Sequence, residues 1–252
     1  NFPVVKKRLY NSIFVPVNLR IIFGLCHFLH KRLMNSIKTH VYFVPGMAAG
    51  SEIFRNIKFP DSYEVHILEW LIPEKSESLE EYAKRMARRV KEKDSVLIGV
   101  SFGGVVVQEM NQFLKLRKLI IISSVKSKNE LPRRMKLASF TKAYKLIPTG
   151  LVLSTDDLTK YSIGPKTKKR LSLYQEYLHV RDKQYLDWAL EKMITWNRKD
   201  KLNNVIHIHG DKDMVFPIKY IDGCEVIKGG THIMILNKGR EISHKLLEIF
   251  EE

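Results

Sequence analysis

Short, continuous apolar runs recur along the chain from residue 40 and are separated by segments with helical spacing. The runs are HVYFVP at 40–45, VHILEW at 65–70, SVLIGV at 95–100, KLIIISS at 118–124, VIHIH at 205–209 and a shorter one at 225–228. Runs of this length without polar alternation are typical of parallel strands buried on both faces. We therefore predict an α/β fold, a three-layer sandwich in which helices cover both faces of a mostly parallel central sheet.

Helical patterns lie between these runs. Residues 78–91 have apolar positions on one face, and Ser78 with Glu81 three residues later forms a capping-box pattern. Further helices are expected over residues 102–114 and 237–251. In a sheet of this kind, ligand sites lie at the carboxyl ends of the strands.

The alternation stops between residues 125 and 204. This stretch carries an aromatic and apolar stripe at mixed helical spacings, which packing between helices explains most simply. The stripe comprises Tyr174, Tyr177, Leu178, Tyr185, Leu186, Trp188, Ala189, Met193 and Trp196. We predict a helical lid inserted at residues 125–200, with residues 38–124 and 201–252 forming the core.

The first 37 residues form a separate segment. Six Lys or Arg and no acid fall in residues 1–33, and an apolar stretch at 13–30 is broken by Pro16, Asn18 and Arg20, too often for a clean bilayer span. Two interpretations stay open. The segment is an interfacial helix that makes peripheral contact with a membrane, or Met34 is the biological start and the preceding residues are not native.

The composition limits the partners and the metal chemistry to be expected. The net charge is +16, but basic residues are interspersed with glutamates and no stripe alternates aromatics with arginines, so no nucleic-acid partner is expected. A lysine-rich bias explains the charge most simply. Cys26 and Cys224 lie far apart and in no metal-ligand spacing, so we expect reduced thiols, no bound metal and a cytoplasmic location.

The motif IGVSFGG at 98–104 places Ser101 between Gly99 and Gly103, directly after a strand and before a helix. Glycines at these positions let the backbone bend sharply, so that the serine side chain projects at the helix amino terminus. This is the context of a nucleophile elbow.

Two later motifs supply an acid and a base. HGDKDMVFP at 209–217 follows a buried strand, and either Asp211 or Asp213 is chemically able to polarise a histidine, although an Asx turn is the preferred explanation for Asp211. GGTH at 229–232 places His232 on a tight loop after the last short strand. The other histidines 207, 209 and 244 are discounted as isolated.

The order of these three motifs resembles that of the α/β-hydrolase superfamily over residues 38–252. The resemblance implies a catalytic triad of Ser101, Asp213 and His232, since alignment of the second motif selects Asp213. It also implies an oxyanion hole made by backbone N–H groups, for which we expect Met47 and Phe102, with Ala48 as the alternative to Met47. The usual histidine before the first of these loops is absent, because Pro45 precedes Gly46.

The resemblance further implies a serine hydrolase that forms an acyl-enzyme and needs no cofactor. A small-molecule carboxylic ester or thioester is the expected substrate. An acyltransferase on the same triad and a non-catalytic ligand-binding member of the fold are the alternatives. Because the early antiparallel strands of the family are not evident before His40, the sheet is either complete or shortened to about six strands.

Overall fold

Six parallel strands form one sheet in the part of the chain that the structure, a computed structural model, describes, namely residues 38–146 and 180–252. The strands are β1 (Thr39–Val44), β2 (Tyr63–Ile67), β3 (Ser95–Val100), β4 (Leu116–Ile122), β5 (Val205–Gly210) and β6 (Glu225–Ile227). Their order across the sheet is β2-β1-β3-β4-β5-β6, and every neighbouring pair is parallel.

The order of the strands reverses at β1. The chain passes from β1 outward to β2, and then crosses back over β1 to continue on its other side with β3. Loops that leave the carboxyl ends of β1 and β3 therefore diverge, and such a switch point is where open parallel sheets form their ligand sites.

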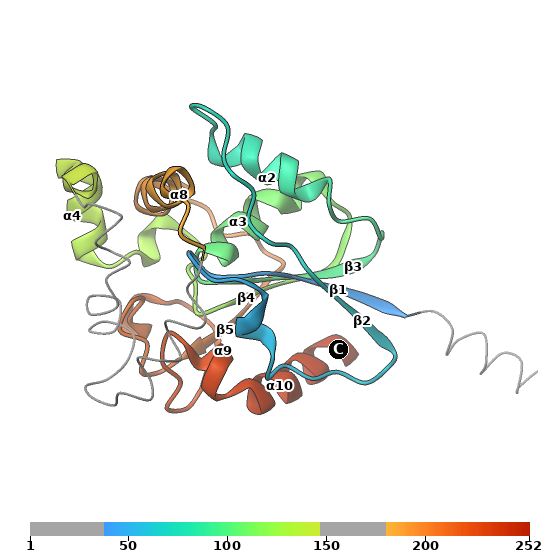
Figure 1. Cartoon of the computed structure of the whole chain (residues 1–252). Coiled ribbons are helices and arrows are strands. Elements are labelled where there is room, and N and C mark those ends of the chain that lie inside the picture. The colour runs from blue at the N-terminus through green and yellow to red at the C-terminus, as the bar shows by residue number, and fades with distance from the viewer. Residues whose placement is uncertain (1–37, 147–179) are drawn as a thin grey trace, which may run out of the picture. The chain divides into compact units, whose positions relative to one another are not determined.

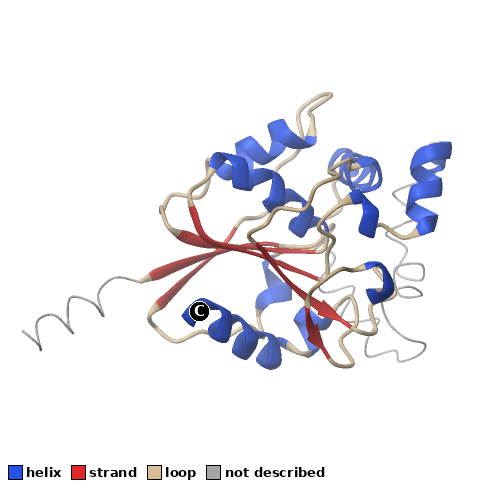
Figure 2. Ribbon diagram, turned by 180° about the vertical axis from the view of Figure 1, so that it is seen from behind, coloured by secondary structure: helices blue, strands red, loops and turns tan. Residues whose placement is uncertain are grey.

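Helices cover both faces of the sheet, as Figures 1 and 2 show from opposite sides. One face carries α2 (Leu79–Ala87), α3 (Phe102–Met110) and α8 (Lys183–Thr195), with α4 (Arg133–Thr141) beside α8, and the other carries α9 (Met234–Asn237) and α10 (Gly239–Glu251). Short 3₁₀ helices are Ser51–Phe54, Asn111–Phe113, Lys128–Glu130, Ala143–Leu146 and Ile218–Tyr220. The predicted three-layer α/β sandwich is confirmed.

The alternation of side chains along each strand builds two separate cores. On β1, Tyr42 and Val44 enter the core beneath α2, α3 and α8, whereas Val41 and Phe43 enter the core beneath α9 and α10. All four are buried, which explains why this strand appears in the sequence as a continuous apolar run.

Several predicted elements have different ends in the structure: β4 occupies Leu116–Ile122 rather than residues 118–124, and α2 and β2 are shifted as well. α2 begins after Ser78, and the expected capping box with Glu81 is present, but the helix ends at Ala87 rather than near residue 91. Arg89 and Val90 instead donate to carbonyls three residues back, which tightens the chain into a turn. The second strand occupies Tyr63–Ile67 rather than residues 65–70. The Leu68 N–H still donates to the Phe43 carbonyl, but the chain leaves the sheet beyond Leu68.

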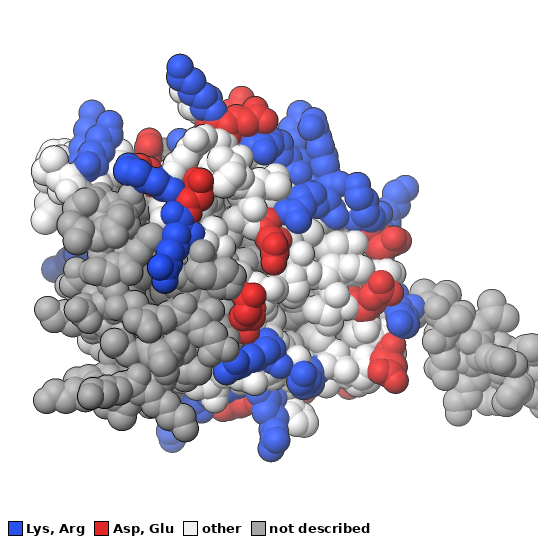
Figure 3. Space-filling view, viewed as in Figure 1, with Lys and Arg blue, Asp and Glu red and all other residues white. Residues whose placement is uncertain are grey.

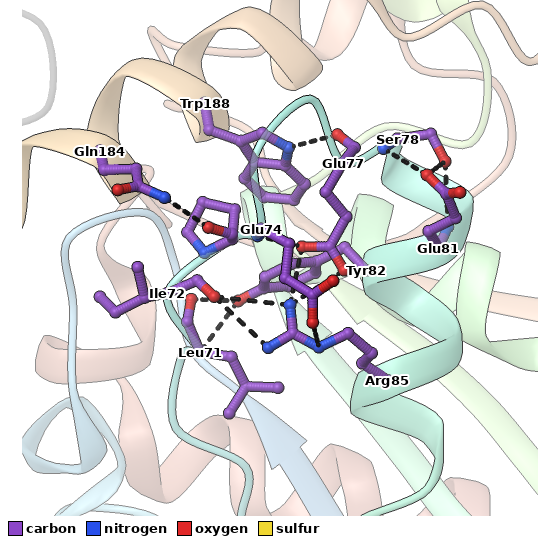
Figure 4. A network of polar contacts seen from close by, with 11 residues as sticks. Leu71, Ile72, Glu74, Glu77, Ser78, Glu81, Tyr82, Arg85, Gln184 and Trp188 are labelled. Carbon is purple, nitrogen blue, oxygen red and sulfur yellow. Dashed lines mark hydrogen bonds and ion pairs between the residues drawn. The ribbon is translucent and has the colours of Figure 1, made fainter.

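α8 is fixed to the loop that precedes α2 (Figure 4). The Trp188 indole N–H donates to the carbonyl of Glu77 at 2.8 Å, and Gln184 Nε2 donates to that of Pro73 at 2.6 Å. The Glu77 carboxylate is buried and accepts from Arg85 at 2.8 Å. The Trp188 ring lies 4.3 Å from that of Tyr82, so this residue of the aromatic stripe packs between helices α8 and α2.

The stripe residues Tyr174, Tyr177 and Leu178 and the segment 1–37 lie outside the described residues, so the boundaries of the predicted lid and the role of the first segment stay predictions. Among the described residues, no helix has the length and apolar character needed to cross a bilayer. On the face shown in Figure 3, basic and acidic side chains are interspersed.

Candidate active site

Ser101 stands in a strained turn between β3 and α3. Its backbone has φ 53° and ψ −117°, a left-handed conformation that costs a non-glycine residue of the order of 1–3 kcal/mol. The turn is tied to β4, because Ser101 N–H donates to Ile122 at 2.9 Å and the Ser124 hydroxyl donates to the Ser101 carbonyl at 2.7 Å. The surrounding sheet therefore holds the serine in a conformation that it would not adopt alone.

The two glycines of the motif are required by close backbone approach. A Cβ on Gly99 would lie 2.3 Å from the carbonyl oxygen of Gly103, and a Cβ on Gly103 would lie 2.3 Å from that of Pro45. Neither distance is compatible with a side chain. The helix α3 can thus begin tightly against β3 and the end of β1, which places Ser101 at the carboxyl edge of the sheet.

His232 reaches Ser101 from the loop after β6. Its Nε2 lies 2.9 Å from Ser101 Oγ, although the two residues are 131 positions apart in the sequence. The loop is held by backbone hydrogen bonds on both sides: Gly230 N–H donates to Ile227 at 3.0 Å, and Lys212 N–H donates to Gly230 at 2.9 Å. The second bond joins the histidine loop to the acid loop, residues 211–217.

Asp213 uses its two carboxylate oxygens for different partners. Oδ2 lies 2.8 Å from His232 Nδ1, while Oδ1 accepts the N–H groups of Val215 and Phe216, each at 2.8 Å. The Asp213 side chain is fully buried, so the carboxylate is oriented before any ligand arrives. The Asx turn expected for Asp211 belongs instead to Asp213, and the Asp211 carboxylate accepts the N–H of Gly229 in the histidine loop at 2.6 Å.

The ionisation of Asp213 sets the tautomer of His232. Burial by itself raises the pKa of the Asp213 carboxyl, but the charge and hydrogen bond of His232 and the N–H of Phe216 outweigh it, so the pKa is lowered. An ionised carboxylate only accepts hydrogen bonds, so His232 Nδ1 carries the proton. In the neutral ring, Nε2 then presents its lone pair to the Ser101 hydroxyl.

A pair of buried histidines stands behind the acid loop. His209 Nε2 lies 2.8 Å from the Phe216 carbonyl and 3.7 Å from Asp213 Oδ2, and His209 Nδ1 lies 3.1 Å from His207 Nε2. Sequence reasoning had discounted both histidines as isolated. Their spacing of two residues on a buried strand was the available signal, because it places both rings on one face of β5.

The loop after β1 lies beside Ser101. A Cβ on Gly46 would contact Ser101 Cβ at 3.5 Å, and Ala49 N–H donates to Gly46 at 3.1 Å to close a turn over Met47 and Ala48. Ala48 has φ 64°, as the third position of a type II turn requires. Phe102 is the first residue of α3, where an N–H has no partner within the helix.

Comparison with known proteins identifies the fold. The sequence matches no protein-family model and no curated protein. The structure resembles a thermophilic esterase from Thermogutta terrifontis with a TM-score of 0.64 at 14% identity, over 84% of this chain and 89% of the esterase. It also resembles an α/β-hydrolase-fold protein from Burkholderia ambifaria (TM-score 0.57, 14% identity, 84% and 90% covered) and a bromoperoxidase from Bacillus anthracis (TM-score 0.59, 15% identity, 85% and 92% covered).

The chain therefore has the α/β-hydrolase fold. Proteins of this one fold include an esterase and a bromoperoxidase, so the fold alone does not fix the reaction.

Proposed function

We propose that this protein is a serine hydrolase that cleaves a carboxylic ester or thioester through an acyl-enzyme. The observation that carries the proposal is the hydrogen-bonded series from Ser101 Oγ through His232 to Asp213, with distances of 2.9 and 2.8 Å. A hydroxyl, an imidazole and a carboxylate in this sequence are the groups that convert a serine into a nucleophile.

The reaction would follow from the protonation states derived above. His232 Nε2 takes the hydroxyl proton as Ser101 Oγ bonds to the substrate carbonyl carbon, and Asp213 stabilises the resulting imidazolium. The imidazolium then returns the proton to the leaving alcohol or thiol as the acyl–oxygen or acyl–sulfur bond breaks. A water molecule, deprotonated by the same ring, then bonds to the acyl carbon, and the ring returns the proton to Ser101 Oγ as the acyl–Oγ bond breaks and the free acid leaves.

The negative charge of the tetrahedral intermediate needs donors beside Ser101. We assign this role to the backbone N–H groups of Phe102 and Met47, with Ala48 as the alternative to Met47. The strained turns at Ser101 and Ala48 support the assignment, because both hold backbone amides in fixed directions at the switch point. One donor of this kind contributes about 3–4 kcal/mol to transition-state stabilisation.

The surroundings of Met47 favour a substrate with an apolar part. Met47 is partly buried and packs against the core cluster that contains Phe102 and Trp188. Trp70 joins this cluster to the oxyanion loop, since its ring lies 5.6 Å from Phe102 and its indole N–H donates to the Gly46 carbonyl at 3.0 Å.

A fluorophosphonate probe tests the proposal directly, because only an activated serine reacts with it. The full chain should acquire one covalent adduct, which mass spectrometry of the digest locates on Ser101, and Ser101→Ala should abolish it. Ser51→Ala provides a matched control, since Ser51 follows the same oxyanion loop and should not affect labelling. Absence of an adduct on Ser101 in the folded chain would refute the hydrolase and favour a ligand-binding role.

Product analysis separates hydrolysis from acyl transfer. Incubation with p-nitrophenyl esters of increasing chain length and with acyl-thioesters, each with and without an added alcohol or amine, should yield the free acid in every case. Transfer to the added acceptor in preference to water would replace the hydrolase by an acyltransferase on the same triad.

A further inference from the structure

Three side chains with metal-ligating atoms meet on β1 and β2, away from Ser101. His40 Nδ1 lies 2.9 Å from His66 Nε2, which lies 3.8 Å from Glu64 Oε1, and the three ligand atoms all fall within 4.8 Å of one another. We propose that His40, Glu64 and His66 bind a divalent transition-metal ion of the Zn²⁺ type. We call these three residues the edge site.

The register of the two strands brings the ligands together. β1 and β2 are parallel, with His40 opposite Glu64 and Tyr42 opposite His66. Residues two apart on a strand share a face, so the ligands and Tyr42 all project on the side of the sheet covered by α2 and α3. The sequence analysis expected no bound metal, because these residues lie in two segments whose register is set only by folding.

Contacts around the edge site hold the imidazoles in place before an ion arrives. The ring of His66 stacks on that of Tyr42 with centroids 4.5 Å apart and planes inclined by 18°. Tyr42 is itself buried, and its hydroxyl accepts the N–H of Lys91 at 3.2 Å. A preformed arrangement of this kind lowers the ordering cost of binding an ion.

To bind an ion, the two imidazole nitrogens would move apart by a few tenths of an ångström and Glu64 Oε1, 3.8 Å from His66 Nε2, would move closer. Without an ion, one imidazole N–H donates a hydrogen bond to the nitrogen of the other ring, 2.9 Å away. A tetrahedral metal bound at about 2.0–2.1 Å would separate the two nitrogens by roughly 3.3 Å. Two imidazoles and one carboxylate form a ligand set that suits Zn²⁺ and leaves a fourth position for water. The side chains of Glu64 and His66 are 46% and 30% exposed, which leaves the site open to solvent.

The position of the edge site indicates a structural role. His40 precedes Val44 by four residues, which is about 13 Å along a strand, whereas Ser101 follows the carboxyl end of β3. An ion at the edge site would therefore join the outermost strand β2 to β1 rather than take part in chemistry at Ser101. The proposal does not depend on the proposed hydrolase activity.

Calorimetric titration of the full chain, stripped of metal with a chelator, with Zn²⁺ tests the edge site. The unchanged chain should bind one ion there, and Glu64→Gln and His66→Gln should each weaken that binding by at least about tenfold. His244→Gln is the matched control, because His244 is exposed on α10 and lies outside the cluster. Ser101→Ala should bind Zn²⁺ as the unchanged chain does.

A second measurement covers the case in which His66→Gln fails to fold. X-ray absorption of the Zn²⁺-loaded, unchanged chain should show imidazole nitrogen and carboxylate oxygen ligands, and thermal unfolding should shift upward with Zn²⁺ in the unchanged chain but not in Glu64→Gln. Zn²⁺ affinity that is unaffected in both Glu64→Gln and His66→Gln, or sulfur ligation in the absorption spectrum, would overturn the edge site.

Discussion

The ring of His209 hydrogen-bonds to the carbonyl of Phe216, with 2.8 Å between His209 Nε2 and the carbonyl oxygen. Because a carbonyl can only accept, Nε2 carries the proton of this neutral ring and Nδ1 accepts from His207 Nε2. Two buried and neutral imidazoles thus support the loop that carries Asp213, and their neutrality has a measurable consequence.

The free energy of unfolding should fall as the pH decreases below about 6.5. Burial lowers the pKa of His207 well below its usual value and that of His209 less strongly. The unfolded chain takes up protons near pH 6.5 that the folded chain does not bind, so acid favours unfolding by at most about 1.4 kcal/mol per pH unit for each ring. Urea unfolding at a series of pH values from 8 to 5 measures the slope.

His207→Gln should flatten this slope, since glutamine keeps an N–H donor for His209 and does not titrate. His244→Gln removes an exposed histidine and should leave the slope unchanged. A slope that is the same in His207→Gln and the unchanged chain would contradict the expected neutrality of His207.

The lowered pKa of Asp213 affects stability in a more acidic range. The ionised carboxylate contributes to the free energy of unfolding above the unfolded pKa of about 3.9, and this contribution is lost as the pH falls through the folded pKa.

Asp213→Asn should slow fluorophosphonate labelling of Ser101 by roughly 10³- to 10⁴-fold and should lower the free energy of unfolding only by the contribution of the ionised carboxylate. The asparagine carbonyl still accepts the N–H groups of Val215 and Phe216, but its amide donates to His232 Nδ1. That donation favours the tautomer with a proton on Nε2, which cannot take the serine proton. The labelling rate and the unfolding midpoint are the two measurements.

Asp211→Asn is the matched control for this prediction. It lies in the same loop, and an asparagine oxygen can still accept from Gly229. Labelling at the unchanged rate is expected. If both variants slowed labelling equally, a general disturbance of the acid loop would explain the effect of Asp213→Asn.

Gly103→Ala should destabilise the fold by about 1–3 kcal/mol and slow labelling of Ser101. Its Cβ would lie 2.3 Å from the Pro45 carbonyl oxygen and 2.5 Å from that of Val44, and neither backbone group can rotate away. Gly46→Ala is the comparison, because its Cβ would make an ordinary contact of 3.5 Å with Ser101 Cβ. In denaturant unfolding, Gly103→Ala should therefore have a clearly lower free energy of unfolding than Gly46→Ala. Equal values would disprove the steric explanation.

Glu77→Ala should lower the free energy of unfolding by about 2–3 kcal/mol. This is somewhat less than the cost of removing one partner from a fully buried ion pair. Its carboxylate is buried and pairs with Arg85, whose side chain is 26% exposed and so keeps some contact with water. Denaturant unfolding measures the loss. Glu80→Ala removes an exposed acid of the neighbouring helix and should change stability by no more than about 0.5 kcal/mol. A comparable loss in both variants would argue against a role for the Glu77–Arg85 pair.

The parts of the fold that depend on local sequence were predictable. β3 occupies the predicted residues 95–100, because all six of its residues are buried and a strained serine ends it. β2 and the end of α2 were displaced, since an apolar or helical pattern continues in the sequence after the backbone has left the sheet or tightened into a turn.

Motif order and the rule that parallel strands end at one edge led to the expectation that Ser101, an acid of the 209–217 motif and His232 lie together, but the choice of Asp213 over Asp211 came from the family resemblance. The contact of His209 with Phe216 and the edge site did not follow. Both depend on how neighbouring strands or loops align, which no single segment of the sequence encodes.

The arrangement of strands also has a consequence for synthesis of the chain. Ser101 is made 131 residues before His232, and β5 and β6, which support the acid and the base, are the last strands to emerge. A nascent chain that has completed β1 to β4 therefore already carries the Ser101 hydroxyl but still lacks His232, the proposed acceptor of its proton. In the proposed hydrolase, Ser101 would therefore stay unreactive until His232 has been synthesised and has left the ribosome.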